Sequence, residues 1–220
     1  MQRTTHLCPL IGFGILALVL CIMPLRDALA LSVGFLARWS GDSDASNTTD
    51  SQYDGFLVGD AKAGIPGIIA GAFQFDGTGD LVSTPLTLPS QGTIALWVKP
   101  FSITDTHGIV GTFGDNNGDN RLWITATGDN GGPGVGPNRV AVNLGSRFVN
   151  DLDIPSPFTG TSWVHLALTF DYISHNYTIY VNGQAIQTST AVRTEPSHPL
   201  DFGGERSNFL QNFWIVSDSS

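Results

Sequence analysis

The sequence predicts an all-β fold, and three observations indicate it. Short runs that alternate between apolar and polar residues recur at roughly ten-residue spacing, separated by clusters of Gly, Asn, Asp and Pro. No window carries the sustained apolar stripe with a 3.6-residue period that marks a helix. The composition, with 26 Gly and 12 Pro among 220 residues, favours many turns. Together these features predict a single antiparallel β-sandwich or barrel.

Three longer runs indicate which side of each strand faces the core. In residues 93–99, the apolar residues Ile94, Leu96 and Val98 alternate with a second set that contains Trp97. The same alternation runs through residues 121–127, with Leu122, Ile124 and Ala126, and through residues 163–171, with Val164, Leu166, Leu168 and Phe170. Since successive side chains of a strand point to opposite faces, the aliphatic sets are expected to form the core between two sheets.

Shorter strands are predicted before and after these runs. A tight turn at residues 76–79 joins two of them, and Asn182-Gly183 joins the last two. Asn-Gly adopts positive φ at both positions of a type I′ turn, so it predicts a two-residue hairpin. The expected shorter strands are residues 33–40, 72–75, 81–83, 177–181 and 184–188.

The first thirty residues are typical of a secretory signal peptide. Arg3 precedes an apolar stretch, and small residues at 28 and 30 form a cleavage site after Ala30. The alternative is a membrane anchor. The uninterrupted stretch of residues 11–25 is shorter than the ~20 residues that a span needs, and it includes Pro24. We therefore expect a cleaved peptide of residues 1–30, a secreted domain of residues 31–220, and no membrane span in the mature chain.

Composition limits what the mature chain does. Both cysteines, Cys8 and Cys21, lie in the signal segment, so disulfides, thiolate nucleophiles and cysteine-bound metals are not expected in residues 31–220. The formal net charge is −9, which disfavours nucleic acid as a partner, because binding to phosphates depends on lysine and arginine. Nearly all of the acidic residues are Asp, a residue typical of turns and of ion-binding loops.

Several segments, taken together, resemble the laminin-G-like jelly roll of the concanavalin A-like lectins and glucanases. The order and spacing of these segments carry the resemblance, which covers almost the whole mature chain: residues 34–40, 54–57, 72–80, 93–100, 162–171 and 180–183. The resemblance implies a two-sheet antiparallel jelly-roll sandwich. Its members usually end on a strand with an acidic pair, which lies beside the first strand. Here residues 209–216 are apolar without such a pair, so either residues 213–216 replace that strand or the chain is a truncated copy.

Catalysis is not expected. The related glucanases use a strand that carries Glu-x-Asp and a further Glu, because glycoside hydrolysis needs two carboxyl groups a few ångströms apart. The nearest counterpart is Asp151-Leu-Asp153-Ile-Pro155, which lacks Glu. Asp151 and Asp153 are thus the candidates for the alternative function, a glycoside hydrolase with an unusual acid pair.

The resemblance also implies where a metal would bind. It places the loop of residues 42–54 and the turn of residues 76–80 at the rim of the sandwich, where several relatives bind one Ca²⁺. Carboxylates suit this cation, so the candidate ligands are Asp54, Asp76 and Asp80. The alternative is that these Asp residues only stabilise turns.

Tryptophans are the candidate ligand-binding residues. Trp97, Trp123 and Trp163 each have the opposite parity to the aliphatic residues of their own strand, so each is expected on an outer sheet face. Flat aromatic rings stack on the C–H faces of sugars, which makes a concave outer sheet a candidate glycan site. The alternative is that the three rings fill a sheet face under a loop.

These features predict a non-catalytic recognition module that binds a glycan or an extracellular protein, with Ca²⁺ as the candidate cofactor. A structural or adhesive fragment of a larger surface protein is the third possibility. Asn47-Thr48-Thr49 and Asn176-Tyr177-Thr178 also match the N-glycosylation pattern, which has meaning only in a cell that glycosylates exported proteins.

Overall fold

A computed structural model describes residues 35–102, 107–112, 121–128, 136–145, 149–160, 162–203 and 208–216, with the backbone alone for His107 and for residues 208–216. The predicted signal segment lies outside these residues. No helix in the described part of the chain has the length and apolarity that a membrane span requires.

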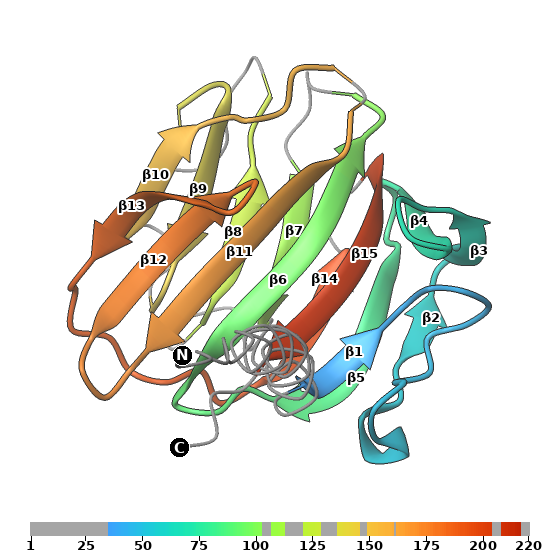
Figure 1. Cartoon of the computed structure of the whole chain (residues 1–220), viewed down its shortest axis with the longest axis horizontal. Helices are drawn as coiled ribbons and strands as arrows, with labels where there is room; N and C mark the ends of the chain where they lie inside the picture. Colours follow the sequence, from blue (N-terminus) through green and yellow to red (C-terminus); the bar gives the residue numbers. More distant parts are fainter. Residues whose placement is uncertain are drawn as a thin grey trace, which may run out of the picture. The chain divides into compact units, whose positions relative to one another are not determined.

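Two antiparallel sheets make up the described domain (Figure 1). The eight strands of sheet A are β1 (Phe35–Trp39), β3 (Lys62–Pro66), β4 (Gly71–Asp76), β6 (Gln91–Pro100), β11 (Val164–Asp171), β12 (Asn176–Val181), β13 (Gln184–Ser189) and β15 (Asn208–Val216). The seven strands of sheet B are β2 (Phe56–Val58), β5 (Leu81–Thr87), β7 (His107–Thr112), β8 (Trp123–Ala126), β9 (Arg139–Asn143), β10 (Leu152–Pro155) and β14 (Pro199–Gly203). A single 3₁₀ turn, η1 (Ser51–Tyr53), lies between β1 and β2. The predicted all-β fold is confirmed, and the antiparallel pairing is consistent with a jelly-roll sandwich.

Strand order within each sheet shows how distant parts of the sequence meet. Sheet A runs β13-β12-β11-β6-β15-β4-β3, and sheet B runs β10-β9-β8-β7-β14-β5-β2. The backbone of β15 lies between β6 on one side and β4 followed by β1 on the other. The segment 213–216 therefore occupies the place beside the first strand, as one of the two alternatives expected.

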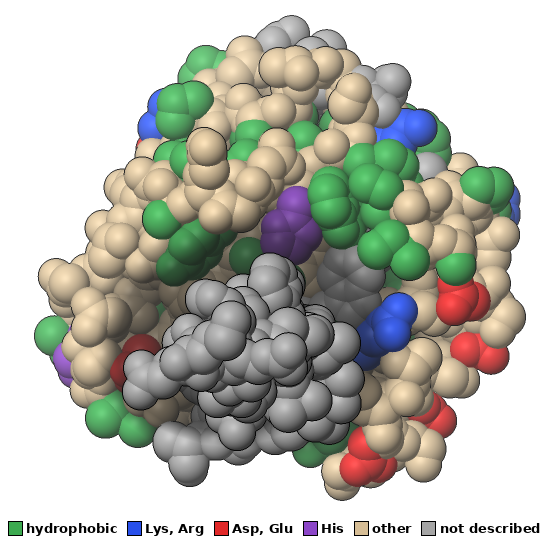
Figure 2. All heavy atoms as spheres, viewed as in Figure 1, with side chains coloured by type: hydrophobic (Ala, Val, Ile, Leu, Met, Phe, Trp, Pro, Cys, Tyr) green, Lys and Arg blue, Asp and Glu red, His purple; other side chains and the backbone are tan. Residues whose placement is uncertain are grey.

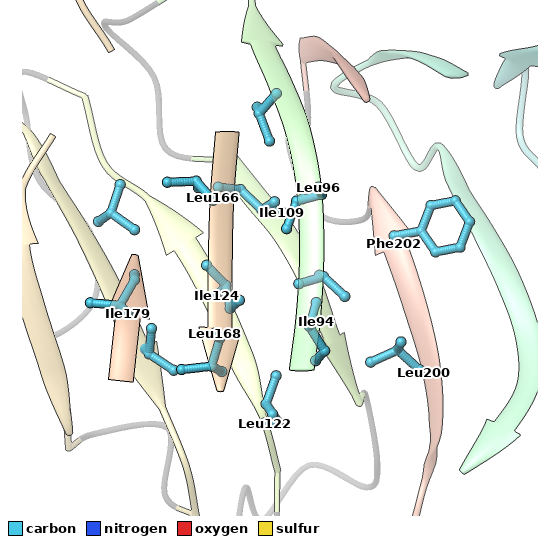
Figure 3. Packing of buried hydrophobic residues seen from close by; sticks show 14 of the residues in the cluster. Ile94, Leu96, Ile109, Leu122, Ile124, Leu166, Leu168, Ile179, Leu200 and Phe202 are labelled. Carbon is cyan, nitrogen blue, oxygen red and sulfur yellow. The ribbon is translucent and has the colours of Figure 1, made fainter. Parts of the chain in front are cut away.

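The core lies between the sheets. The predicted inward residues of β6, β8 and β11 are all at most 5% exposed. Figure 3 shows side chains from β6, β11 and β12 of sheet A directed toward those of β7, β8 and β14 of sheet B. Strict alternation accounts for this arrangement in β6 and β11, because a strand with one buried face must place every second residue inward. In β8 the alternation is incomplete, since Thr125 is 2% exposed as well.

The β12–β13 hairpin forms at the predicted turn. Val181 pairs with Gln184, and φ is +49° at Asn182 and +80° at Gly183, as a type I′ turn requires. Six strands, β2, β3, β7, β9, β10 and β14, were not expected from the sequence. They have three to six residues, and Pro155 and Pro66 end two of them, so their patterns resemble those of loops.

Candidate functional site

The outer face of sheet A presents one continuous row of side chains from β6, β11 and β12. We define this outer face by the residues that alternate with the core, all of them half-buried: Gln91, Thr93, Ala95, Trp97, Lys99, His165, Ala167, Thr169, Asp171, Thr178 and Tyr180. Figure 2 views the molecule from this side. Most of the acidic side chains visible in this view gather on the side of β1, β2 and β3.

An aromatic pair occupies one end of this face. Trp97 of β6 is paired in register with His165 of β11, and their ring centroids lie 5.1 Å apart with the planes tilted by 59°. Burial lowers the pKa of His165 below its ordinary value, so its imidazole is neutral at neutral pH. The pair thus presents an uncharged aromatic surface.

Small residues follow the aromatic pair. Ala95 is opposite Ala167, which in turn pairs with Tyr180 of β12. Because methyl groups project less than the side chains on either side, this middle stretch of the face is lower than its ends.

A polar cavity of about 430 Å³ lies at the far end of the face. The register pairs Thr93 with Thr169 and Gln91 with Asp171 there, and Asn176 begins the next strand. The lining residues are Gln91, Gly92, Thr93, Thr169, Phe170, Asp171 and Asn176. Hydroxyl, amide and carboxylate groups therefore converge at this end.

Asp171 is held by the turn that follows it. Its carboxylate accepts hydrogen bonds from the hydroxyl and the amide of Ser174 and from the amide of Ile173, the last two at 2.8 Å. The bonds from Ser174, with smaller effects from Gln91 and Ile173, lower the pKa of Asp171 to about 2. The cavity therefore contains a permanent negative charge at neutral pH, and the outer-face residues of β6, β11 and β12 contain one cation, Lys99, at the opposite end.

The three predicted tryptophans do not share one face, which corrects the expectation of a single tryptophan-bearing sheet. Trp97 lies in β6 of sheet A, and Trp163 lies one residue before β11 of the same sheet. Trp123 lies in β8 of sheet B, where Arg121 sits over its ring at 5.9 Å. Each sheet has its own outer face, so Trp123 and Trp97 are on opposite sides of the sandwich. Alternation in a strand predicts that a side chain points outward, but it does not identify the sheet.

Three carboxylates form a separate group at the edge of the sandwich. Oxygens of Asp60, Asp76 and Asp80 all lie within 4.8 Å of one another. Asp76 and Asp80 were predicted to bind a metal together with Asp54. The carboxylate of Asp54 instead accepts the amide of Asn47 at 2.7 Å. Asp60, which follows β2, was missed because its approach to the 76–80 turn depends on the pairing of β2 with β5.

Asp80 organises this acidic group. Its side chain is 1% exposed and accepts the amides of Asp60 at 2.8 Å and of Asp76 at 2.9 Å. Gly59, with φ of +73°, lets the loop approach, since a Cβ there would lie 2.5 Å from an Asp80 oxygen. The Asp60 pKa is raised by a hydrogen bond shared with Asp80 and by the charges of Asp76 and Asp80. Three hard oxygen donors with excess negative charge fit a divalent cation such as Ca²⁺.

The candidate acid pair for hydrolysis is engaged elsewhere. Asp153 lies 2.7 Å from the Arg139 guanidinium, and Asp151 lies 2.6 Å from that of Arg193. The Asp151 side chain is 1% exposed and also accepts the amide of Leu144. Each carboxylate is therefore bound by an arginine, and Asp151 has little contact with solvent.

Several residues of the outer face of sheet A were not singled out from the sequence. Gln91, His165 and Asp171 share the outward parity of Trp97, which is the one sequence signal that could have selected them. Their grouping also needs the register between β6 and β11, which alternation alone does not define.

Solved structures with the same fold include carbohydrate-binding proteins. One is domain 4 of AbnA, a GH43 extracellular arabinanase from Geobacillus stearothermophilus, in complex with arabinotriose. The identity is 20% and the TM-score 0.61, and the match covers 83% of this chain and 92% of that one. Another is a structure of botulinum neurotoxin type C, a toxin whose cell entry depends on interaction with two ganglioside molecules. The identity is 16% and the TM-score 0.57, and the match covers 83% of this chain and 47% of that one.

A third neighbour comes from an enzyme. A mutant Trypanosoma rangeli sialidase with trans-sialidase activity matches with 14% identity and a TM-score of 0.59, over 84% of this chain. The chain spans 30% of the length of that enzyme and about half of the toxin structure. At these identities the likeness shows the fold alone.

Comparison with curated protein sequences found no similar one. A family model does match the sequence, and it is described as the concanavalin A-like lectin/glucanases superfamily. It covers residues 76–214, well over half of the chain and most of the strands of both sheets. The chain therefore belongs to the concanavalin A-like lectin/glucanase superfamily.

Proposed function

We propose that this domain is a non-catalytic recognition module that binds uncharged oligosaccharides along the outer face of sheet A. The observation that carries the proposal is the row from the Trp97–His165 pair, across Ala95 and Ala167, to the polar cavity at Gln91 and Asp171. An aromatic surface beside hydrogen-bonding groups is the combination that a sugar needs, because its C–H faces stack and its hydroxyls need polar partners.

The dimensions of the row fit a short glycan. Trp97 and Gln91 are six residues apart on β6, which corresponds to about 20 Å along a strand. This length accommodates several sugar units and exceeds that of a monosaccharide. Among the outer-face residues defined above, Lys99 is the one cation and lies at the Trp97 end, so the polar cavity holds no partner for a carboxylate or sulfate group.

Two further arguments support binding without turnover. Asp151 and Asp153, the candidate acid pair, are each bound by an arginine, and the side chain of Asp151 is buried. Structures with this fold include a domain in complex with arabinotriose, an uncharged oligosaccharide. We further propose that the chain is exported, on the basis of the basic, apolar and small-residue regions within residues 1–30.

An array of immobilised oligosaccharides tests the proposal. We expect retention of neutral oligosaccharides of three or more units, weaker retention of monosaccharides, and little retention of sialylated or sulfated glycans. Incubation of the best ligand with the protein should release no shorter product. Turnover of a polysaccharide would support the hydrolase instead, and binding to an extracellular protein without any glycan would support an adhesive fragment.

We also propose that Asp60, Asp76 and Asp80 hold Ca²⁺ and so tie the loop after β2 to the β4–β5 turn. Because the pKa of Asp60 is raised, the folded protein retains this proton at pH values at which the unfolded chain has lost it. The contribution of Asp60 to the stability of the metal-free protein should therefore fall as pH rises from about 3.8 toward the raised pKa. Bound Ca²⁺ would remove this loss by neutralising the mutual repulsion.

Asp60→Asn is expected to abolish the response to calcium. At about hundred-fold excess over its Kd, Ca²⁺ should raise the Tm of the unmodified protein by roughly 5 °C or more, and that of the variant by much less. In chelator at pH 7 the variant should melt above the unmodified protein, because one repelling charge is gone. Thermal unfolding with and without calcium measures both effects.

Asp54→Asn is the matched control. The carboxylate of Asp54 accepts a hydrogen bond from the backbone amide of Asn47 and is not part of the acidic group. This variant should keep the full calcium-dependent rise in Tm. Loss of the response in Asp54→Asn together with its retention in Asp60→Asn would contradict the proposed ligand set.

A further inference from the structure

The two N-glycosylation patterns of the sequence lie in very different surroundings. Asn47-Thr48-Thr49 is in the loop between β1 and η1, and Asn176-Tyr177-Thr178 begins β12. An attached glycan is bulky and hydrophilic, so a folded domain tolerates it only where the asparagine amide nitrogen faces open solvent. This requirement separates the two sites.

Asn47 is part of the packing of its loop. The residue is 8% exposed, and its Nδ2 is buried without a hydrogen-bond partner among the described residues. Its Oδ1 accepts the amide of Thr49 at 2.8 Å, the hydroxyl of Thr49 at 2.6 Å and the amide of Asp50 at 3.1 Å. A sugar on Nδ2 would have to occupy space that the loop already fills, and its accommodation would break these bonds.

Asn176 lies at an exposed turn. The turn from Asp171 to Asn176 reverses the chain between β11 and β12 through His175, whose φ is +57°. The Asn176 side chain is exposed, and its Nδ2 donates one local bond to the Ser174 hydroxyl at 3.1 Å. Ile173 in the same turn is 68% exposed, so a hydrophilic glycan there would also shield an apolar side chain.

We infer that Asn176 is the N-glycosylation site that the native domain can carry, and that Asn47 is not. In the reaction, Nδ2 of Asn176 attacks the anomeric carbon of an oligosaccharide linked to a polyprenyl diphosphate. The N–C bond forms, the anomeric C–O bond to the phosphate breaks, the polyprenyl diphosphate leaves, and Nδ2 loses one proton. No electrons are transferred. The modification occurs on the nascent chain, so both patterns are available before folding and the fold selects between the products.

The location gives the modification a consequence. Asn176 lines the polar cavity with Gln91, Thr93 and Asp171, so a glycan on its Nδ2 would stand at the edge of that cavity. This consequence rests on the proposed function: a glycosylated domain should bind oligosaccharides more weakly at the polar end. The presence of a glycan on Asn176 is tested without any oligosaccharide ligand, because it is measured as the mass of the peptide that contains Asn176.

Expression of the full chain in cultured mammalian cells, with an added export signal, tests the inference. Protease-resistant folded product is separated from retained, protease-sensitive product. Both are then deglycosylated enzymatically in ¹⁸O-water, which marks each formerly modified asparagine, and mapped by peptide mass spectrometry. We expect the folded product to carry a glycan at Asn176 and none at Asn47, with any Asn47-modified chain confined to the retained fraction.

Three variants keep the outcome decisive. Asn176→Gln should lose one glycan from the folded product, and Thr178→Ser, which preserves the pattern, should retain it. Thr49→Ala removes the pattern at Asn47, so its folded product must carry the Asn176 glycan even where the unmodified chain is largely retained. The inference is overturned if the folded product has Asn176 unmodified or carries a glycan on Asn47. It is also overturned if the glycosylated Thr49→Ala variant does not fold, while the same variant produced without glycans in bacteria does.

Discussion

Arg193→Met is expected to lower the free energy of unfolding by about 3 kcal/mol, a large part of the stability of an ordinary domain. Arg193 lies in the segment that connects β13 of sheet A to β14 of sheet B. Its Nε and Nη2 donate to one oxygen of Asp151 at 2.9 and 2.6 Å, and the other oxygen accepts the amide of Leu144 at 2.8 Å. The pair therefore ties this connection to the segment before β10.

Burial makes the loss of Arg193 costly. The Asp151 side chain is 1% exposed, so without the guanidinium the buried carboxylate has no counter-ion among the residues that the structure describes. Burial and, to a smaller extent, the charge of Asp151 raise the pKa of Tyr177 to about 12, so this side chain stays neutral at pH 7 and supplies no counter-charge. Since the Arg193 side chain is 27% exposed, water reaches part of the vacated space, which places the expected effect at the lower end of the range for buried pairs.

The chain offers a matched control for this prediction. Arg139 forms the other ion pair in the described residues, with Asp153 at 2.7 Å, but those side chains are 31% and 37% exposed. Arg139→Met should therefore cost about 1 kcal/mol or less. Adding Asp151→Asn to Arg193→Met should recover most of the stability, because the buried charge is gone. Urea denaturation at equilibrium measures all three, and equal costs for Arg193→Met and Arg139→Met would contradict the argument.

Trp97→Ala is expected to weaken oligosaccharide binding by about ten-fold or more. An aromatic ring that stacks on a sugar in a binding face contributes about 1.4 kcal/mol or more, which corresponds to that factor in Kd. The loss should come from stacking alone, since the Ala95–Ala167 stretch and the polar cavity remain. Titration of the oligosaccharide retained most strongly on the array gives the Kd of each protein.

Trp123→Ala is the control for this prediction. Trp123 is also a half-buried, outward tryptophan, but it belongs to sheet B and lies under Arg121. Its removal should leave the Kd unchanged. Urea unfolding of both variants excludes global misfolding as the cause. A larger loss of binding in Trp123→Ala than in Trp97→Ala would place the site on sheet B and refute the assignment.

Local pattern alone was sufficient for the fold class and for the buried face of the two longest predicted strands. The alternation of Leu96 with Trp97 and of Leu166 with His165 predicted the core of β6 and β11, and Asn182-Gly183 predicted the hairpin. These features depend on neighbours in sequence: a strand has a two-residue period, and a type I′ turn needs two residues that tolerate positive φ. The short strands were not predicted, because four residues that end at a proline, as in β10, are too few to show a two-residue period.

Only the tertiary structure decided which of these residues meet. Trp97 and Trp123 have the same outward parity in sequence, yet strand order places them in different sheets and on opposite faces. Asp60, and not the predicted Asp54, lies beside Asp76 and Asp80, because the pairing of β2 with β5 places the loop after β2 next to the turn of residues 76–80. Sheet order and register are set by contacts between distant segments, and these contacts depend on the packing of the whole core. The alternation within a single strand therefore does not determine sheet order or register.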